Sequence, residues 1–428
     1  MRGRKRAALI FLVLTLVAAA CGNSKSSGGG GNAAGDDKTG VTDTEIRVGG
    51  VASITNGLGG TYGDAFDGLE AYFDQVNAQG GVFGRQLKLV AKRDDNGQAS
   101  RNKDQVRALV EQDKVFAVLP VSTITFAGGK YLADNNIPTF GWNINPEWNL
   151  GPNLFGEKGS NLCFDCPNAW SSFLAKQNGF TNFGILTYTA VQSQDCAKGW
   201  KASVDQVGGP NAGVKLAFED TSLSFGFTPG DIAADLDQMK NNNVQFLATC
   251  IDGAGSAKLG QAFNDNKMTV VQNLPNGYDN KLISDNAAAL EGDYVTASFF
   301  PFEADQKPQA LQQFIDAMGK RNKAPNENSL SGWINGMQFV QGLKDAGSDF
   351  NRQKLIDAIN KETNFTADGI RPGGINWTTT GHTGRDTEDC VSVLQVQSGK
   401  LVPKYGQPGK PMICFDLSNL DLDNPTYK

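Results

Sequence analysis

The chain has 428 residues, of which 39% are hydrophobic and 20% charged, and its formal net charge is −6. A chain of this length is expected to form about two or three domains. The acidic balance argues against general nucleic-acid binding, which needs a basic face. His382 is the only histidine, so a metal site made of several histidines is excluded. We expect no cofactor and no metal, and we expect His382 to be a solvated turn residue.

The first 20 residues have the features of a secretory signal peptide. Arg2, Arg4, Lys5 and Arg6 precede an apolar run over 7–20 that is too short to span a bilayer as a mature helix. The small residues before Cys21 are similar to a bacterial lipobox, in which the cysteine is lipidated and becomes the mature N-terminus. Ala18-x-Ala20 also fits an ordinary signal peptidase, which would leave a freely secreted protein. Residues 21–40 are predicted to be the lipidated cysteine and a Gly/Ser-rich tether.

The cysteine count favours an oxidised, exported protein. Lipidation of Cys21 leaves an even set, typical of disulfides in exported chains. Zinc is the competing interpretation for the C-x-x-C pair, but no second such pair or histidine pair completes a site. The remaining cysteines are Cys163, Cys166, Cys196, Cys250, Cys390 and Cys414.

The first half of the chain alternates apolar strands with amphipathic helices. Strands are predicted over 45–52, 86–92, 115–119 and 137–140. Helices are predicted over about 63–79 and 102–112, the first with Phe66, Leu69, Phe73 and Val76 on one face. This alternation predicts a parallel sheet with helices on both faces.

The pattern then starts again, which predicts a second α/β lobe. Strands are expected over 183–187, 215–218 and 244–249, and helices over about 197–207, 231–241 and 329–346. Near the end, the apolar stretches 390–396 and 402–404 flank Ser398-Gly399-Lys400, which indicates a β-hairpin.

Several short motifs occur in a characteristic order: Val41–Gly49, Tyr62-Gly63, Val76–Arg85 (VNAQGGVFGR), Asp94-Asp95, Ile137-Pro138, Asn145-Pro146-Glu147, Gly277-Tyr278-Asp279 and Glu291–Phe302. With them, the chain resembles the substrate-binding lipoproteins of branched-chain amino acid ABC transporters, the leucine/isoleucine/valine-binding type. The resemblance implies a type I periplasmic-binding-protein fold, with two doubly wound parallel-sheet lobes joined by three hinge crossovers. The lobes would comprise 41–165 plus 299–372 and 166–298 plus 373–428.

The resemblance also implies a function. The protein would be an extracytoplasmic solute-binding lipoprotein, monomeric and anchored to the outer face of the cytoplasmic membrane. It would capture an amino acid or a related carboxylate or amide and deliver it to ABC permease subunits. A ligand-sensing lipoprotein of the same fold without a transport role is the alternative. An enzyme is not expected, because no nucleophile elbow, metal cluster or Ser/His/Asp set is present.

Strand exits of the first lobe supply candidate ligand contacts, because ligands of open α/β sheets bind beyond the carboxyl ends of the strands. Tyr62 follows a glycine-rich turn, where the alternative is a plain turn. Ser122 and Thr123 lie where a helix should begin and would attract an anion. The resemblance implies that they hold a carboxylate, and simple N-capping is the alternative. The third exit is Trp142, Asn143 and Ile144, where Trp142 as ordinary packing is the alternative.

The second lobe departs from the family pattern. Asp195 lies where the family has an aromatic residue, and Ala254 lies where it has the glutamate that binds the α-amino group. Asp252 is the nearest acid and would have to replace that glutamate. Tyr278 is a further candidate, and with Phe126, Trp142 and Tyr62 it would line an aromatic site. Such a site suits an apolar or aromatic carboxylate better than leucine.

Disulfide pairing is predicted from neighbouring elements. Cys196 begins a helix and Cys250 ends a strand of the same lobe, which favours Cys196–Cys250. Cys390–Cys414 would close the C-terminal hairpin region, and Cys163–Cys166 would pair locally near the first crossover.

Overall fold

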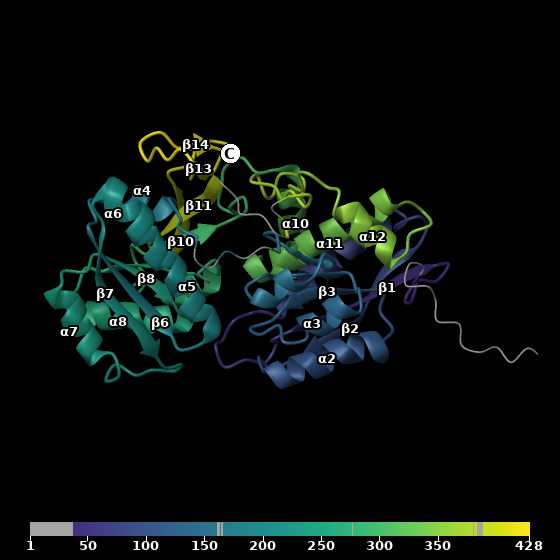
Figure 1. The fold of residues 1–428 in the computed structure, drawn as a ribbon, viewed down its shortest axis with the longest axis horizontal. Helices are drawn as coiled ribbons and strands as arrows, with labels where there is room; N and C mark the ends of the chain where they lie inside the picture. The colour runs from purple at the N-terminus through teal and green to yellow at the C-terminus, as the bar shows by residue number, and fades with distance from the viewer. Residues whose placement is uncertain (1–36, 161–162, 164–165, 276, 380, 383–387) are drawn as a thin grey trace, which may run out of the picture.

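The computed structural model describes residues 37–160, 163, 166–275, 277–379, 381–382 and 388–428. The predicted signal peptide, Cys21 and the tether up to residue 36 lie outside these ranges. The described residues form two lobes side by side, each built on its own β-sheet (Figure 1). No helix in these ranges is both long enough and apolar enough to cross a membrane.

The sheet of the first lobe has five parallel strands in the order β2-β1-β3-β4-β5. Its strands are β1 (Glu45–Ala52), β2 (Gln86–Asp94), β3 (Ala117–Ser122), β4 (Thr139–Gly141) and β5 (Leu154–Gly156). The central strand β3 is buried along its whole length, as expected of a parallel strand covered on both faces. The predicted parallel sheet is therefore confirmed, with β1 at its predicted bounds.

Helices cover both faces of this sheet. One face carries α1 (Asp64–Ala78) and α11 (Glu327–Ala346), with α10 (Gln309–Lys320) and α12 (Arg352–Ile359) beside them. The other carries α2 (Ala99–Glu111), α3 (Gly129–Asp134) and the 3-10 turn η1 (Pro146–Leu150). Thus α10–α12 lie with β1–β3 although they are far from them in the sequence (Figure 1).

The α1–α11 contact depends on two glycines. A Cβ added at Gly68 would lie 1.7 Å from the backbone oxygen of Ser329, and one added at Gly332 would lie 1.8 Å from that of Ala65. Side chains at these positions would push the helices apart. The two backbones can therefore approach closely, which places the start of α11 at the boundary between the lobes.

The sheet of the second lobe has the order β14-β13-β11-β10-β9-β8-β6-β7, with β12 paired to β11. Its parallel part is β6 (Asn182–Tyr188), β7 (Lys215–Leu223), β8 (Phe246–Cys250), β9 (Val271–Asn273) and β10 (Tyr294–Ala297). Its antiparallel part is β11 (Glu388–Gln397), β12 (Lys400–Lys404), β13 (Met412–Asp416) and β14 (Thr426–Tyr427). The predicted C-terminal hairpin is confirmed as β11–β12.

Two apolar layers cover this second sheet. On one face, α4 (Trp170–Asn178) and α5 (Val191–Ala202) pack with β6 and β8, and α5 continues into the π-helix η2 (Ser203–Gly208) and α6 (Gly209–Ala212). On the other face lie α7 (Ala233–Asn241) and α8 (Gly253–Asp265). The short α9 (Asn280–Asp285) follows β9. The predicted helix over 197–207 therefore begins earlier, at Val191, and ends in π geometry.

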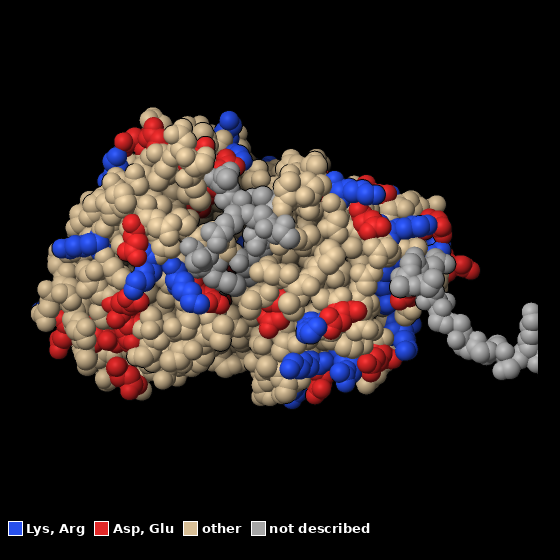
Figure 2. Space-filling view, in the orientation of Figure 1, with Lys and Arg blue, Asp and Glu red and all other residues tan. Residues whose placement is uncertain are grey.

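The chain passes between the lobes three times: after β5, after β10 and before β11. Within the described ranges three disulfides are formed, Cys163–Cys166, Cys196–Cys250 and Cys390–Cys414, which confirms the predicted pairing. On the face shown in Figure 2, acidic and basic side chains of the described residues are mixed over both lobes.

Three expectations are wrong. First, no helix begins at Ser122-Thr123, because the helix after β3 starts only at Gly129. Second, the end of the predicted tether is bound to the first lobe, since Asp37 forms an ion pair with the buried Arg352. Third, His382 is half-buried rather than fully solvated, because its ring packs against Trp377, with 4.9 Å between ring centroids.

Candidate functional site

A cavity of about 310 Å³ lies between the two lobes at the carboxyl ends of their strands. The first lobe lines it with Leu58, Tyr62, Ile124, Trp142, Asn143 and Ile144. The second lobe lines it with Tyr188, Ala190, Gln192, Ser193, Cys196, Phe225, Cys250, Ile251, Asp252 and Pro275. Its volume is at the lower end of the range of small-molecule sites, about 300–1,000 Å³.

The walls of this cavity are mainly apolar and aromatic. Tyr62 and Trp142 contact each other in the first lobe, with 5.7 Å between ring centroids. Tyr188 and Phe225 do the same in the second lobe, at 4.2 Å. Phe225 is 50% exposed although its side chain is large and apolar. A solute with an apolar body would therefore gain contact area in this cavity.

A second cavity of about 120 Å³ lies beside the first and is more polar. It shares Leu58, Tyr62, Trp142 and Asp252 with the large cavity. Tyr278, Asp279 and Glu327 line its other side. Tyr278 is buried, and its hydroxyl donates to a carboxylate oxygen of Glu303 and accepts from the backbone N–H of Phe302 at 2.8 Å.

Asp252 occupies a distinctive position where the two cavities meet. It is the N-cap of α8, and its Oδ1 accepts a hydrogen bond from the backbone N–H of Gly255 at 3.0 Å. Its Oδ2 accepts one from the hydroxyl of Tyr188 at 2.5 Å. Burial, together with the charge of Asp252, raises the pKa of Tyr62 to about 12. The Asp252 carboxylate is thus hydrogen-bonded to a tyrosine of its own lobe and acts electrostatically on a tyrosine of the other lobe.

The charge balance of the cleft is acidic. Among the described residues that line the two cavities, the acidic side chains are Asp252, Asp279 and Glu327, and none is basic. Lys158 lies close by, with its Nζ 3.3 Å from Oε1 of Glu327, but lines neither cavity. Lys158 also approaches Glu157, at 3.8 Å.

Six residues predicted from the sequence line these cavities: Tyr62, Trp142, Asn143, Ile144, Asp252 and Tyr278. Ser122, Thr123 and Asp195 line neither. Ser122 is buried and donates to the side-chain oxygen of Asn328 at 3.3 Å, while Thr123 is buried beside it. Asp195 forms an ion pair with Lys198 at 2.6 Å on the same helix.

Phe126 was expected to line an aromatic site, and this prediction is wrong. Its side chain is fully buried in the core of the first lobe, where its ring lies 4.7 Å from that of Trp148. The cause is the delayed start of α3. Residues 123–128 form a loop that turns Phe126 inward against η1 and leaves Ile124 at the cavity.

Sequence reasoning missed several cavity residues. Tyr188 ends β6 and Ile251 follows β8, so the rule of strand exits could have found both. Gln192 donates from its side chain to the backbone oxygen of Ile124 in the other lobe at 2.8 Å. Phe225 lies in the loop after β7, and no local pattern marks either of these two residues.

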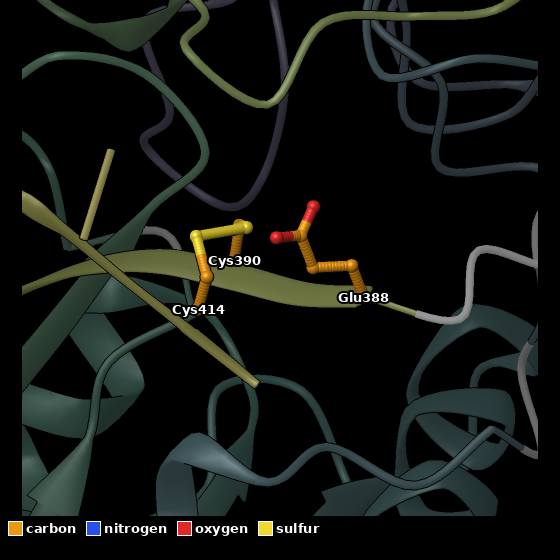
Figure 3. A group of neighbouring side chains, drawn as sticks. All are labelled: Glu388, Cys390 and Cys414. Atoms are coloured by element: carbon orange, nitrogen blue, oxygen red, sulfur yellow. A yellow bond between two sulfur atoms is a disulfide. The ribbon is translucent and has the colours of Figure 1, made fainter. Parts of the chain in front are cut away.

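One group of potential metal ligands occurs in the described part of the chain, Glu388 with Cys390 and Cys414 (Figure 3). The two sulfur atoms are bonded to each other as a disulfide, so neither is a thiolate ligand. Glu388 also forms an ion pair with Lys428. These side chains therefore do not make a metal site.

Comparisons with known proteins agree with this architecture. The sequence model of the periplasmic binding protein family matches residues 45–400. The substrate-binding protein of a fatty acid ABC transporter from Thermomonospora curvata has a TM-score of 0.69 at 19% identity, covering 86% of this chain and 93% of that one. A search of curated proteins finds no match.

Two further solved structures have bound ligands. A solute-binding protein of an ABC transporter from R. palustris, in complex with benzoate, has a TM-score of 0.65 at 16% identity and covers 84% of this chain and 95% of that one. LivJ from Streptococcus pneumoniae, in complex with isoleucine, has the same TM-score and identity, and the match covers 84% of this chain and 98% of that one. At these identities the likeness shows a common fold.

Proposed function

The chain belongs to the periplasmic binding protein family and has its type I fold, and from this premise we propose that it is the extracytoplasmic solute-binding protein of an ABC importer. It captures one small organic molecule between its lobes and presents it to the permease subunits. Proteins of this architecture close on their ligands by a hinge motion. Binding, rather than chemical conversion, is the activity proposed.

The observation that carries this proposal is the cavity of about 310 Å³ with walls from both lobes. A solute in this position contacts Trp142 of one lobe and Tyr188 of the other at the same time. It therefore stabilises the closed arrangement over the open one, since a ligand shifts a two-state equilibrium by its differential affinity for the two states. The hydrogen bond from Gln192 to Ile124 joins the lobes at the same place.

We further propose that the protein acts as a monomer attached to the outer face of the cytoplasmic membrane by a lipid on Cys21. The three disulfides support an oxidising location outside the cytoplasm. The Gly/Ser-rich segment after Cys21 would hold the folded lobes away from the membrane surface. Cys21→Ala is expected to release the protein from the membrane fraction, and a variant that stays bound would contradict the anchor.

A thermal-shift screen tests the binding function. The chain from Gly22 onward contains every described residue and is the sample. The panel holds amino acids, amides, amines, and aliphatic and aromatic carboxylates. A solute that binds the native state alone stabilises it by about 2.7 kcal/mol at 100 times its Kd. We expect at least one solute to raise the melting temperature.

Ala190→Trp provides the structural control for this screen, because Ala190 lines the cavity and a tryptophan there would occupy part of it. We expect this variant to lose the shift. Ala288→Trp, on an exposed surface of the same lobe, is expected to keep it. No shift with any solute, or a shift that persists in Ala190→Trp, would contradict the proposed function of the cavity.

A further inference from the structure

The cavity leaves one acidic charge without a basic partner. Asp252 accepts hydrogen bonds from Gly255 and Tyr188, but no ion pair within the described ranges includes it. An apolar solute that fills the cavity removes water from around this carboxylate. Withdrawing a charge from water without a counter-charge is costly. A solute that carries its own positive charge to Asp252 avoids this cost.

The aromatic side chains around Asp252 favour the same kind of solute. The faces of tyrosine, tryptophan and phenylalanine rings attract cations within about 6 Å of the ring centroid. Tyr62 and Trp142 supply such rings from the first lobe, and Tyr188 and Phe225 from the second. Asp279, in the adjoining small cavity, adds negative potential, whereas Glu327 beside it is paired with Lys158. Both the lining rings and the lining charges therefore select against an anion.

No strong receptor for a carboxylate lies in the cavity. Ser122 and Thr123 lie outside its lining, and the helix end expected beside them is absent. The start of α5, with Ala190 as its N-cap, does border the cavity. A helix end contributes about half a unit charge, which is less than the full charge of Asp252.

We propose that the solute is an apolar organic amine, with an aromatic or aliphatic body, one protonated nitrogen facing Asp252, and no carboxylate. This inference rests on the proposed function and specifies the substrate class of the same cavity. Such an amine differs from an α-amino acid, whose carboxylate would meet the acidic and apolar walls of the cavity. The body of the amine lies between Trp142, Ile144 and Ile251, and the nitrogen lies between the rings of Tyr62 and Tyr188.

Calorimetric titration with four probes of similar size tests this class. The probes are 2-phenylethylamine, 2-phenylethanol, 3-phenylpropanoate and phenylalanine, each added to the chain from Gly22 onward. We expect the amine to bind at least about tenfold more tightly than each of the other three, the scale expected for a desolvated charge pair. Tighter binding of 3-phenylpropanoate or phenylalanine would overturn the inference and leave the proposed function intact.

Asp252→Asn removes the charge at this position but keeps the N-cap of α8, because asparagine is as good an N-cap as aspartate. We expect this variant to melt close to the wild type and to lose about tenfold or more in affinity for the amine. Asp231→Asn is the matched control. The carboxylate of Asp231 accepts hydrogen bonds from Thr228 in an exposed turn, and Asp231 lines neither cleft cavity. The affinity of the Asp231→Asn variant for the amine should therefore equal that of the wild type.

Two further results would overturn the inference. One is amine binding that Asp252→Asn leaves unchanged. The other is no binding by any of the four probes when a solute of the thermal-shift panel that is not an amine does bind. If none of the four probes and no solute of the panel binds, the proposed function itself is overturned.

Discussion

His382 shows how burial decides the behaviour of a single residue. Its Nε2 lies 2.7 Å from the side-chain oxygen of Asn360, and its ring packs against Trp377 and Phe155. Burial lowers the pKa of His382 to about 4. The neighbouring glycine in the sequence suggested a solvated turn. Trp377 lies only five residues before His382, but Phe155 comes from a distant strand, β5, and the local sequence does not show that the two rings pack against the imidazole.

The lowered pKa predicts a pH-dependent stability. A histidine in the unfolded chain has a pKa of about 6.5, so between about pH 4 and 6.5 the unfolded state binds more protons than the folded state. The contribution of His382 is therefore complete above about pH 6.5 and is lost as the pH falls towards 4. Urea unfolding should show the stability of the wild type, relative to His382→Gln, decreasing over this range. A difference that is independent of pH would contradict the burial of the imidazole.

Among the residues of the cleft, the sequence identified those at strand exits. Tyr62, Trp142 and Asp252 follow β1, β4 and β8, and the rule for open α/β sheets places such residues at one edge. Ser122 also ends a strand, β3, yet it lines neither cavity, and its buried hydroxyl donates to Asn328, which lines the small cavity in its place. Strand position thus predicts which end of the sheet a residue lies at, but not the direction of its side chain.

At the scale of elements, α5 is held firmly as one wall of the cavity. The Cys196–Cys250 disulfide joins it to the end of β8, and both cysteines line the cavity. The side-chain amide of Gln194 donates to the backbone oxygens of Tyr188 at 2.7 Å and Thr221 at 2.8 Å. Covalent and hydrogen-bonded attachments therefore fix the helix against β6, β7 and β8.

Replacing both Cys196 and Cys250 by serine tests this attachment. The disulfide closes a loop with a sequence separation of 54 residues, and loss of a bond of this kind costs about 2–5 kcal/mol. We expect chemical denaturation to show a loss of this size and calorimetry to show weaker solute binding. Serine at both Cys390 and Cys414 should lower stability but leave binding unchanged, because that pair lies on β11 and β13, away from the cavity. Equal effects of the two variants on binding would contradict a wall-forming role for α5.

Elements with strong apolar periodicity were predictable, and those that depend on distant packing were not. The strands β1, β2 and β6 appear where apolar runs predicted them. The two short strands β5 and β9, of three residues each, exist because neighbouring strands offer them a hydrogen-bonding edge. The delayed start of α3 was not predictable, since the loop before it is stabilised by Asn102, whose side chain accepts from the backbone N–H of Gly128 at 2.8 Å.

At the scale of the molecule, the three passages between the lobes meet around buried charged groups. Glu157 lies just after β5, and the electrostatic influence of Lys158 and Arg371 opposes the rise in its pKa that burial causes. Arg371, on the third passage, donates to the hydroxyl of Ser298 on the second at 3.2 Å. The crossovers are thus linked to one another near Glu327, which lines the small cavity.

The two-lobed architecture followed from the repeated alternation of strands and helices, together with the family resemblance. The composition of the cleft did not follow from the sequence, because it depends on which residues of one lobe face those of the other. Gln192 and Ile124 are in contact for this reason, although neither lies in a motif. The absence of basic residues among the described cleft side chains is likewise visible only after folding.

A crystal structure of the chain with the strongest solute of the panel tests the central claim most directly. The account predicts electron density for the solute between the lobes, in contact with Trp142, Tyr188 and Ile251. Density at another surface hollow, such as the one lined by Asp345, Lys354 and Glu362, with the cavity between the lobes left free of solute, would contradict it.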